Sequence, residues 1–188
     1  MSVRLDTARL LLREPEDGDL ASLLRFYRVN DARLARWEPD RVDDAAFHLR
    51  WVRWRRAESE TGHGRSFLGF DRTHPEALVA ILNLYDIVAG STHSAMLGYS
   101  VDGAYEGQGY AREAVGAVIA YAFGSLQLHR LRASYDPAND RSGGLLRRLG
   151  FTVEGYARDA LFLRGTWRDQ VLTSLVNPDW HSPAQPPA

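Results

Sequence analysis

Cysteine and lysine are both absent from this chain of 188 residues, because all 23 of its basic residues are arginine. Without cysteine there is no disulfide, no thiolate nucleophile and no cysteine-ligated zinc. Without lysine there is no Schiff base and no Walker-type loop, which places a lysine on the phosphates of a nucleotide. Several common kinds of covalent catalysis and of nucleotide binding are therefore excluded.

A large net charge and a long apolar run are also missing. The formal net charge is −1, so no overall field attracts nucleic acid or an anionic membrane. The first residues, MSVRLDTARLLLREPEDGD, hold only short apolar stretches interrupted by arginine and acidic residues, unlike a signal peptide or a membrane span. We therefore expect a cytoplasmic protein with no membrane partner and no direct nucleic-acid partner.

Metal and hydrolase signatures are lacking as well. None of the six histidines has the HxxxH or HExxH spacing of a zinc site. No serine lies in the G-x-S-x-G turn that exposes the nucleophile of many hydrolases. The sequence therefore predicts neither a bound metal nor a serine hydrolase.

What is present is an ordinary balance for a globular protein, with 45% hydrophobic and 25% charged residues. Strand-like and helix-like segments follow one another without a repeat or a linker, which predicts one α+β domain over residues 1–180 with mostly antiparallel strands. The tail at 181–188 is rich in proline and is expected to be disordered. The expected strands are 9–14, 64–71, 77–88, 93–103 and 129–135, followed by a hairpin at 159–176 that turns at Arg164 and Gly165.

Helices are expected between these strands. Acidic residues open a first helix over 15–29, and Phe47, Trp51 and Trp54 recur at helical spacing in a second, where we expect all three to be core. A third helix follows Gly109, and a short fourth covers 139–149 with Gly150 as its C-terminal cap.

Two glycines stand where the third helix begins, in YEGQGYAREA at residues 105–114. Glycine suits positions of unusual backbone geometry or of close approach to a ligand. Because a helix N-terminus has unpaired amides and a positive dipole, Gly107 and Gly109 indicate a site for a phosphate-bearing ligand. A tight turn between a strand and a helix explains the same residues without any ligand. The loop is not a dinucleotide fingerprint, since Arg112 stands where a third small residue is needed.

Several longer segments surround this loop in a fixed order. They are TARLLLREP at the start, WEP at 37–39, LGYSVDGAYEGQGYA, NDRSGGLLRRLGF, EGYARD and GTWRDQVLTSLVNPDW. From about Thr7 to Trp180 the chain resembles the Gcn5-related N-acetyltransferase (GNAT) superfamily, in its RimJ/RimL branch and closest to RimJ-type N-terminal alanine acetyltransferases. The resemblance implies a mostly antiparallel twisted sheet of about six to seven strands with a splayed cleft, flanked by about four helices.

The resemblance also implies acetyl-CoA as cosubstrate, lying in that cleft. The superfamily loop has the form Q/R-x-x-G-x-G/A, and here Glu106 stands at its Q/R place. Asn139 and Ser142 would face the pantetheine or the thioester, although an asparagine at a helix start is also a simple N-cap. Pantetheine would pair with backbone around Tyr99 and Val101, and the pyrophosphate would bind amides of Gln108, Gly109, Tyr110 and Ala111.

Two catalytic groups that many members of the superfamily use are absent. Leu146 stands where those members have a tyrosine that acts as acid, and Met96 stands where they have a strand glutamate that acts as base. A thiol has a pKa near ~8.5, so it leaves readily as a thiolate. An α-amine has a pKa of about 7.7–8.0, so it loses its proton easily. Correct positioning of the two reactants can therefore replace a strong acid–base pair. The candidates are Ser142 as proton donor and Glu38 as the group that holds or deprotonates the ammonium. Glu38 can equally be a surface loop residue.

These observations predict an acetyl-CoA-dependent N-terminal acetyltransferase that acts on a protein by direct transfer. The resemblance names the N-terminal alanine of a small-subunit ribosomal protein as acceptor. A small-amine or antibiotic acetyltransferase on the same fold stays open, as does a non-catalytic CoA-binding ribosome-assembly factor. The chain is expected to be a monomer or a homodimer, and a dimer through the terminal hairpin is conceivable.

Overall fold

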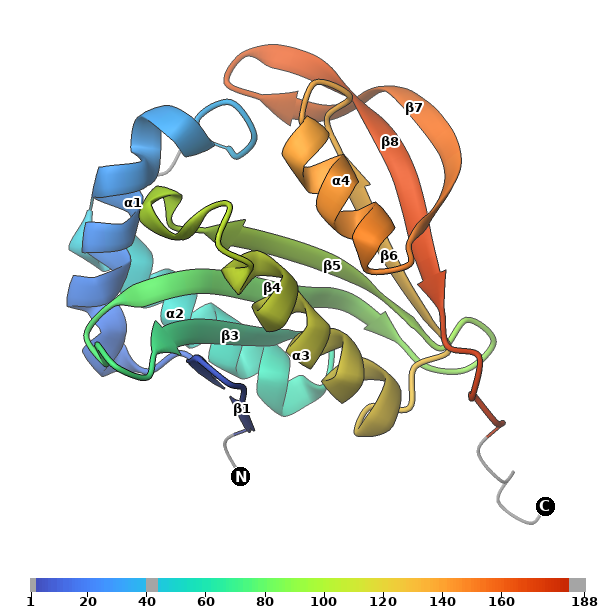
Figure 1. Ribbon diagram of the computed structural model, residues 1–188, viewed down its shortest axis with the longest axis horizontal. Coiled ribbons are helices and arrows are strands. Elements are labelled where there is room, and N and C mark those ends of the chain that lie inside the picture. The colour runs from blue at the N-terminus through green and yellow to red at the C-terminus, as the bar shows by residue number, and fades with distance from the viewer. Residues whose placement is uncertain (1–2, 40–43, 183–188) are drawn as a thin grey trace.

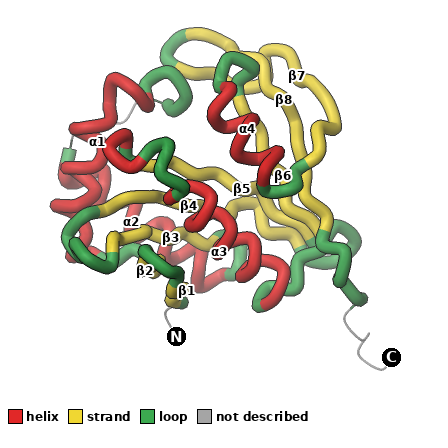
Figure 2. Tube along the Cα trace, viewed as in Figure 1, coloured by secondary structure: helices red, strands yellow, loops and turns green. Residues whose placement is uncertain are grey.

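The computed structural model describes residues 3–39 and 44–182, and the strands within these ranges form one mixed sheet (Figures 1 and 2). Its strand order is β1-β2-β3-β4-β5-β6-β8-β7, and every neighbouring pair is antiparallel except β5 and β6. The strands are β1 (Arg4–Asp6), β2 (Leu10–Arg13), β3 (Arg65–Asp71), β4 (Leu78–Val88), β5 (Ser94–Val101), β6 (Arg130–Tyr135), β7 (Thr152–Leu163) and β8 (Thr166–Val176).

Helices cover both faces of the sheet. In Figure 1, α3 and α4 lie in front of the strands and α2 lies behind them. Helix α1 lies at the left of the molecule and packs against α2. No helix among the described residues is long and apolar enough to cross a membrane. The helices are α1 (Leu20–Leu34), α2 (Ala45–Thr61), α3 (Tyr110–Gly124) and α4 (Asp140–Arg148), with 3-10 turns η1 (Asp17–Asp19) and η2 (Gly103–Tyr105).

The core is divided by the sheet into two clusters. Alternation along β4 sends Leu82 and Leu84 to the cluster under α3 and α4, and Ile81 to the cluster under α1 and α2. In the second cluster Phe26 of α1 packs with Trp51 and other residues of α2 and β3. The apolar run of β4 is therefore a strand that is buried on both faces.

Local capping explains where α2 and α4 begin and end. Asp44 accepts hydrogen bonds from the amides of Ala46 and Phe47 at the start of α2, and Gly62 ends that helix in the left-handed region. The predicted cap at Gly150 is confirmed, because its φ is +90° and its amide donates to the Arg147 carbonyl.

Residues 3–39 and 44–182 form the expected α+β architecture, with four α-helices and a mostly antiparallel sheet of eight strands where six to seven were expected. The additional strand is β1, whose three residues alternate charge with one apolar side chain and are too short to give a periodic signal. Strand β7 begins at Thr152 instead of near 159, since its exposed residues show no apolar alternation. The hairpin turn at Arg164 and Gly165 is confirmed.

Two helix predictions need correction. The acidic residues assigned to the first helix form η1 instead, and α1 runs on to Leu34 because its buried stripe continues past Val29. Trp54 is not a core residue, because 52% of it is exposed and the Arg55 guanidinium lies 4.3 Å from its ring centre. Of the tail expected to be disordered, residues 183–188 lie outside the described part of the chain.

One discontinuity in the sheet matters for function. Strands β5 and β6 pair only from Ser94 to Met96, opposite Arg130 to Arg132. Beyond Met96 the two strands diverge, β5 toward the loop before α3 and β6 toward the start of α4 (Figure 1). The second half of β5 therefore has β4 on one side and no strand on the other, which is the splay that the resemblance implies.

Candidate active site

The glycine loop has the backbone geometry that only glycine adopts readily. Gly107 and Gly109 have φ of +73° and +87°, and Gly109 is the N-cap of α3. Within the described residues, no hydrogen bond is recorded from the backbone amides of the four predicted pyrophosphate ligands, Gln108, Gly109, Tyr110 and Ala111. Free amides at a helix N-terminus are suited to an anion.

Arg9 braces this loop from the edge of the sheet. Its guanidinium binds the Glu113 carboxylate at 2.7 Å, donates to the Gln108 carbonyl at 3.0 Å and lies 3.9 Å from the centre of the Tyr110 ring. Burial acts to raise the pKa of Glu113, but hydrogen bonds from Thr7 and Arg9 outweigh it and hold that pKa below its ordinary value. Glu113 is therefore a carboxylate that anchors Arg9 beside the loop.

Glu106, which departs from the family pattern, is held by two arginines. Arg33 of α1 binds one carboxylate oxygen at 2.6 Å, and Arg141 in the first turn of α4 binds the other. Arg33 also donates to Asn30 and to the Val101 carbonyl. The pair with Arg141 connects the glycine loop to α4, on the far side of the splay.

Tyr99 and Ser142 also meet across the splay. The Tyr99 hydroxyl lies 2.9 Å from the Ser142 Oγ, joining β5 to α4. Burial raises the pKa of Tyr99, so its phenol is protonated at neutral pH. The Asn139 side chain accepts a hydrogen bond from the Ser142 amide at 3.2 Å, so Asn139 acts as the N-cap of α4.

Close packing fixes the start of α4 above β6. A side chain at Gly143 would lie 2.7 Å from the ring of Tyr135, so the helix can approach this strand only with glycine there. This contact sets the position of the adjacent Ser142.

Glu38 lies on the opposite side of β5. Its carboxylate accepts a hydrogen bond from the Ser100 hydroxyl, and Ser100 follows Tyr99 on the strand. Because consecutive side chains point to opposite faces, Glu38 and Ser142 are on different sides of the sheet at the splay. Glu38 is therefore more than an isolated surface residue. Of the loop that carries it, residues 40–43 lie outside the described part.

Apolar side chains occupy both positions that the resemblance matches to the usual acid and base. Leu146 is buried in the core under α4, and Met96 is opposite Tyr85 and Arg132 in the sheet. The sequence reading missed Tyr85, whose ring covers Gly98 so closely that a Cβ there would lie 3.3 Å from it. Burial is the main cause that raises the pKa of Tyr85 and keeps its phenol protonated.

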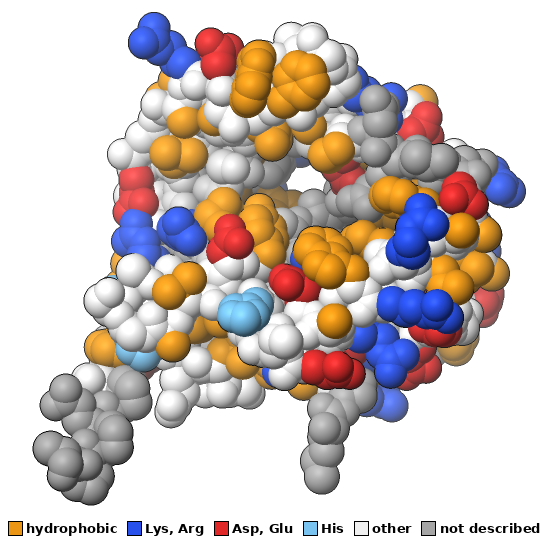
Figure 3. Space-filling model, turned by 180° about the vertical axis from the view of Figure 1, so that it is seen from behind, with side chains coloured by type: hydrophobic (Ala, Val, Ile, Leu, Met, Phe, Trp, Pro, Cys, Tyr) orange, Lys and Arg blue, Asp and Glu red, His pale blue; other side chains and the backbone are white. Residues whose placement is uncertain are grey.

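The surface behind the sheet is hollowed. Seen from behind, a deep hollow opens in the upper half of the molecule, below the end that carries the β7–β8 hairpin (Figure 3). Hydrophobic side chains gather around it.

No cluster of three or more metal-ligating side chains occurs in residues 3–39 and 44–182, so the described part offers no metal centre.

Comparison with known proteins identifies the family. The model of the acetyltransferase (GNAT) domain matches residues 9–152, which span the glycine loop, both sides of the splay and α4. The chain belongs to the GNAT acetyltransferase family. The [ribosomal protein uS5]-alanine N-acetyltransferase of Escherichia coli is 39% identical to it over 180 residues, covering 95% of this GNAT chain and 93% of that protein.

Solved structures agree with this assignment. A ribosomal-protein-alanine acetyltransferase of Vibrio fischeri matches the GNAT chain with a TM-score of 0.88 at 28% identity, over 95% of this chain and 99% of that one. RimJ of Mycobacterium smegmatis, solved in complex with CoA-disulfide, gives a TM-score of 0.84 at 26% identity, over 93% and 86%. The CoA held by this neighbour agrees with the acetyl-CoA that the resemblance implies as cosubstrate.

The glycine loop gives a first prediction. We expect Gly109→Val to lower acetyl-CoA affinity by more than about tenfold, because a β-branched residue cannot hold φ near +87° and the loop amides would turn away from the phosphates. The expected strain is in the backbone, since the nearest atom to an added Cβ is the Arg9 guanidinium at 3.4 Å. Calorimetric titration with acetyl-CoA measures the loss.

Gly165→Val is the matched control for this variant. Gly165 has φ of +81° and no atom within 4 Å of an added Cβ, but it lies in the β7–β8 turn, away from the loop. It should suffer similar backbone strain and keep native acetyl-CoA affinity. Equal affinity in both folded variants would show that the glycine loop is only a turn.

Glu106 gives a second prediction. Its carboxylate adds a negative charge to a loop expected to bind phosphates and neutralises Arg33 and Arg141. Glu106→Gln should therefore tighten acetyl-CoA binding by about two- to fivefold at low salt. The gain should shrink at high ionic strength, because exposed charges are screened. Weaker binding in the variant would instead show that the two ion pairs are needed to hold the loop.

Proposed function

We propose that this acetyltransferase modifies the N-terminal α-amine of a protein, and that the protein is ribosomal with an N-terminal alanine. The observation that carries the proposal is the placement of Ser142 and Glu38 on opposite sides of β5, joined to the neighbouring residues Tyr99 and Ser100. Acetyl-CoA would approach from the side of α3 and α4, and the amine from the side of Glu38. The uS5-alanine acetyltransferase of Escherichia coli supports the choice of acceptor.

The donor side is built to hold and orient the cosubstrate. Amides of Gln108, Gly109, Tyr110 and Ala111 would bind the pyrophosphate. Of the two residues expected to pair with pantetheine, Val101 already has its carbonyl engaged by Arg33, so backbone groups around Tyr99 would carry most of that pairing. Asn139 would act mainly through its cap, which holds the Ser142 amide and thereby its hydroxyl.

The transfer forms a bond between the amine nitrogen and the acetyl carbon and breaks the bond from that carbon to sulfur. The nitrogen gives up one proton, and the sulfur takes one. Ser142 would deliver a proton to the sulfur and take one in turn from Tyr99, whose phenol is protonated at neutral pH and would then recover a proton from solvent. Glu38 would hold the ammonium and, directly or through water, accept the proton that leaves it.

No stronger base is needed for this acceptor. An α-amine has a pKa of about 7.7–8.0, so a sizeable fraction is already neutral near pH 7.5, whereas a lysine amine at about 10.4 is neutral in roughly one part per thousand. A carboxylate that positions the ammonium is therefore a sufficient base for acetylating an N-terminal amine and an insufficient one for a lysine amine.

The Tyr99–Ser142 pair gives a third prediction. Ser142→Ala should lower kcat by about tenfold or more and change the KM for acetyl-CoA less, because the hydroxyl acts on the departing sulfur and not on the bound ground state. Tyr99→Phe should give a smaller loss of kcat, since Ser142 keeps its own proton. Steady-state kinetics with varied acetyl-CoA measures both.

Asn139→Asp serves as the control for Ser142→Ala. Aspartate caps a helix about as well as asparagine, so thermal stability and kcat should stay near those of the wild type. A loss of acetyl-CoA affinity at unchanged stability would give Asn139 a direct contact with the cosubstrate. Unchanged kinetics in Ser142→Ala would remove Ser142 from the mechanism.

The acceptor gives a fourth prediction. A peptide with a free N-terminal alanine should be acetylated far faster than one that is blocked there and carries an internal lysine. The kcat/KM for the first peptide should rise with pH and level off near about 8, because the neutral α-amine is the reactive form. Mass spectrometry of the products over a pH series measures both.

Glu38→Gln tests the acceptor side of this proposal. The variant should slow acetylation chiefly through a higher KM for the peptide, because the ammonium loses its counter-charge, while acetyl-CoA affinity stays unchanged. Faster reaction of the blocked lysine peptide would contradict the N-terminal assignment and favour a small-amine acceptor. Binding of acetyl-CoA with no turnover of either peptide would favour a non-catalytic CoA-binding protein.

A further inference from the structure

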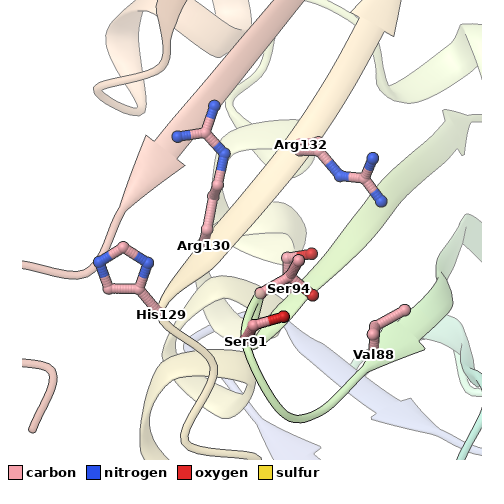
Figure 4. Close-up of a pocket in the computed structure, with 7 residues that line it drawn as sticks. Val88, Ser91, Ser94, His129, Arg130 and Arg132 are labelled. Carbon is pink, nitrogen blue, oxygen red and sulfur yellow. The ribbon is translucent and has the colours of Figure 1, made fainter. Parts of the chain in front are cut away.

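A second cavity lies at the closed end of the splay, outside the site described above. It has a volume of about 440 Å³ and is lined by Val88, Ser91, Thr92, Ser94, His129, Arg130 and Arg132 (Figure 4). Three of these residues carry hydroxyls and two carry guanidinium groups, and none is acidic. The cavity therefore has many hydrogen-bond donors and a positive charge.

The two arginines of this cavity differ in their partners. Arg130 binds Glu154 of β7, so its charge is already neutralised. No hydrogen bond or ion pair joins the Arg132 guanidinium to any residue in the described ranges, and its Nε is buried without a partner. In Figure 4, Arg130 points toward β8, whereas Arg132 reaches from β6 toward β5.

An unpartnered guanidinium that is partly buried indicates a missing anion. Removing a charged donor from water costs free energy unless an acceptor replaces the water. Tyr85 is close enough for the charge of Arg132 to act on it: the arginine acts to lower the pKa of Tyr85, against the larger effect of burial. A neutral phenol does not balance the charge, and arginine pairs best with a carboxylate or a phosphate.

The position of Arg132 relates the cavity to the acceptor side of the splay. Arg132 is opposite Met96, in the last pair that joins β5 to β6. Met96, Gly98 and Ser100 alternate onto the same face of β5, and Ser100 binds Glu38. At roughly 3.3 Å per residue, the four steps from Met96 to Ser100 span about 13 Å, or about four residues of an extended peptide.

We propose that this cavity binds an acidic side chain of the acceptor protein, three to five residues after the N-terminal alanine, through Arg132. The proposal rests on the proposed function, since it places the acceptor α-amine at Glu38. The acceptor peptide would run along the face of β5 that carries Ser100, so that the enzyme recognises a carboxylate as well as a free N-terminus. Ser91, Thr92 and Ser94 supply further donors for its oxygens.

Paired peptides test this selectivity. Each is about ten residues long, begins with a free alanine and is neutral except for glutamate or glutamine at position 4, 5 or 6, counting the alanine as position 1. With saturating acetyl-CoA and low salt, the wild type should favour the best glutamate peptide about tenfold in kcat/KM over its glutamine partner, as expected for a charge-assisted hydrogen bond. Arg132→Gln should bring this ratio close to one, and Arg132→Lys should restore part of it.

Arg4→Gln is the matched control, because it removes an exposed arginine from edge strand β1 and should keep the wild-type ratio. Raising the ionic strength should lower the wild-type ratio. A wild type that does not distinguish the peptides overturns the proposal. So does an Arg132→Gln variant that slows both peptides equally, since that is the result of a structural role.

Calorimetric titration of the same peptides onto the enzyme–CoA complex separates this proposal from the proposed function. Tighter binding of glutamate peptides without any acetylation would keep the cavity assignment and reject N-terminal transfer. Acetylation of both peptides at one rate would keep N-terminal transfer and reject the cavity assignment. A short RNA strand that binds the wild type but not Arg132→Gln, where glutamate peptides do not bind, would assign the cavity to phosphate and overturn the proposal.

Discussion

The loss of pairing between β5 and β6 after Met96 is the constraint on which the rest of the site depends. Backbone polar groups inside a sheet need partners, so a strand that parts from its neighbour must find substitutes. Here Arg33 takes the Val101 carbonyl, and the Tyr99 hydroxyl meets Ser142 of α4 across the opening. The remaining backbone of β5 faces the opening as an edge to which an extended ligand can add. The same break in the sheet thus creates the site proposed for the cosubstrate and determines which side chains border it.

In the proposed mechanism, strand alternation divides the reaction between the two faces of the sheet. Tyr99 and Ser100 are consecutive, so one points toward α4 and the other toward the loop that carries Glu38. In the proposed mechanism, proton delivery to sulfur and capture of the ammonium therefore belong to groups that cannot neutralise each other by direct contact. In place of an acid and a base on adjacent elements, this enzyme has a hydroxyl pair on one side and a carboxylate on the other. Such a separation suits an acceptor whose amine is already partly neutral near pH 7.5 because of its own pKa.

Patterns within one element were readable from the sequence, and contacts between distant elements were not. The apolar run of β4, the helical period of α3 and the glycine loop each depend on neighbours in the chain, and all three are found in the structure. Strand β1 was missed because three residues carry too little periodicity. The Tyr99–Ser142 contact joins residues 43 positions apart, so no local spacing could reveal it. Trp54 has the spacing of a core residue but points to solvent, because a helical period does not tell how wide the buried stripe is.

Arginine side chains hold the glycine loop through contacts that lysine could not make. Arg9 binds a carboxylate, a backbone carbonyl and an aromatic face at once, and Arg33 joins Glu106, Asn30 and Val101 in the same way. A planar guanidinium with five fixed donors can hold three groups in set directions, whereas an ammonium is a point charge on a flexible stem. Glu106 is acceptable at a place where the family has glutamine or arginine because two such guanidinium groups enclose its carboxylate. The charge of the loop is consequently set by arginines that come from α1 and α4, and replacing either by lysine would keep that charge while losing the geometry that positions the loop.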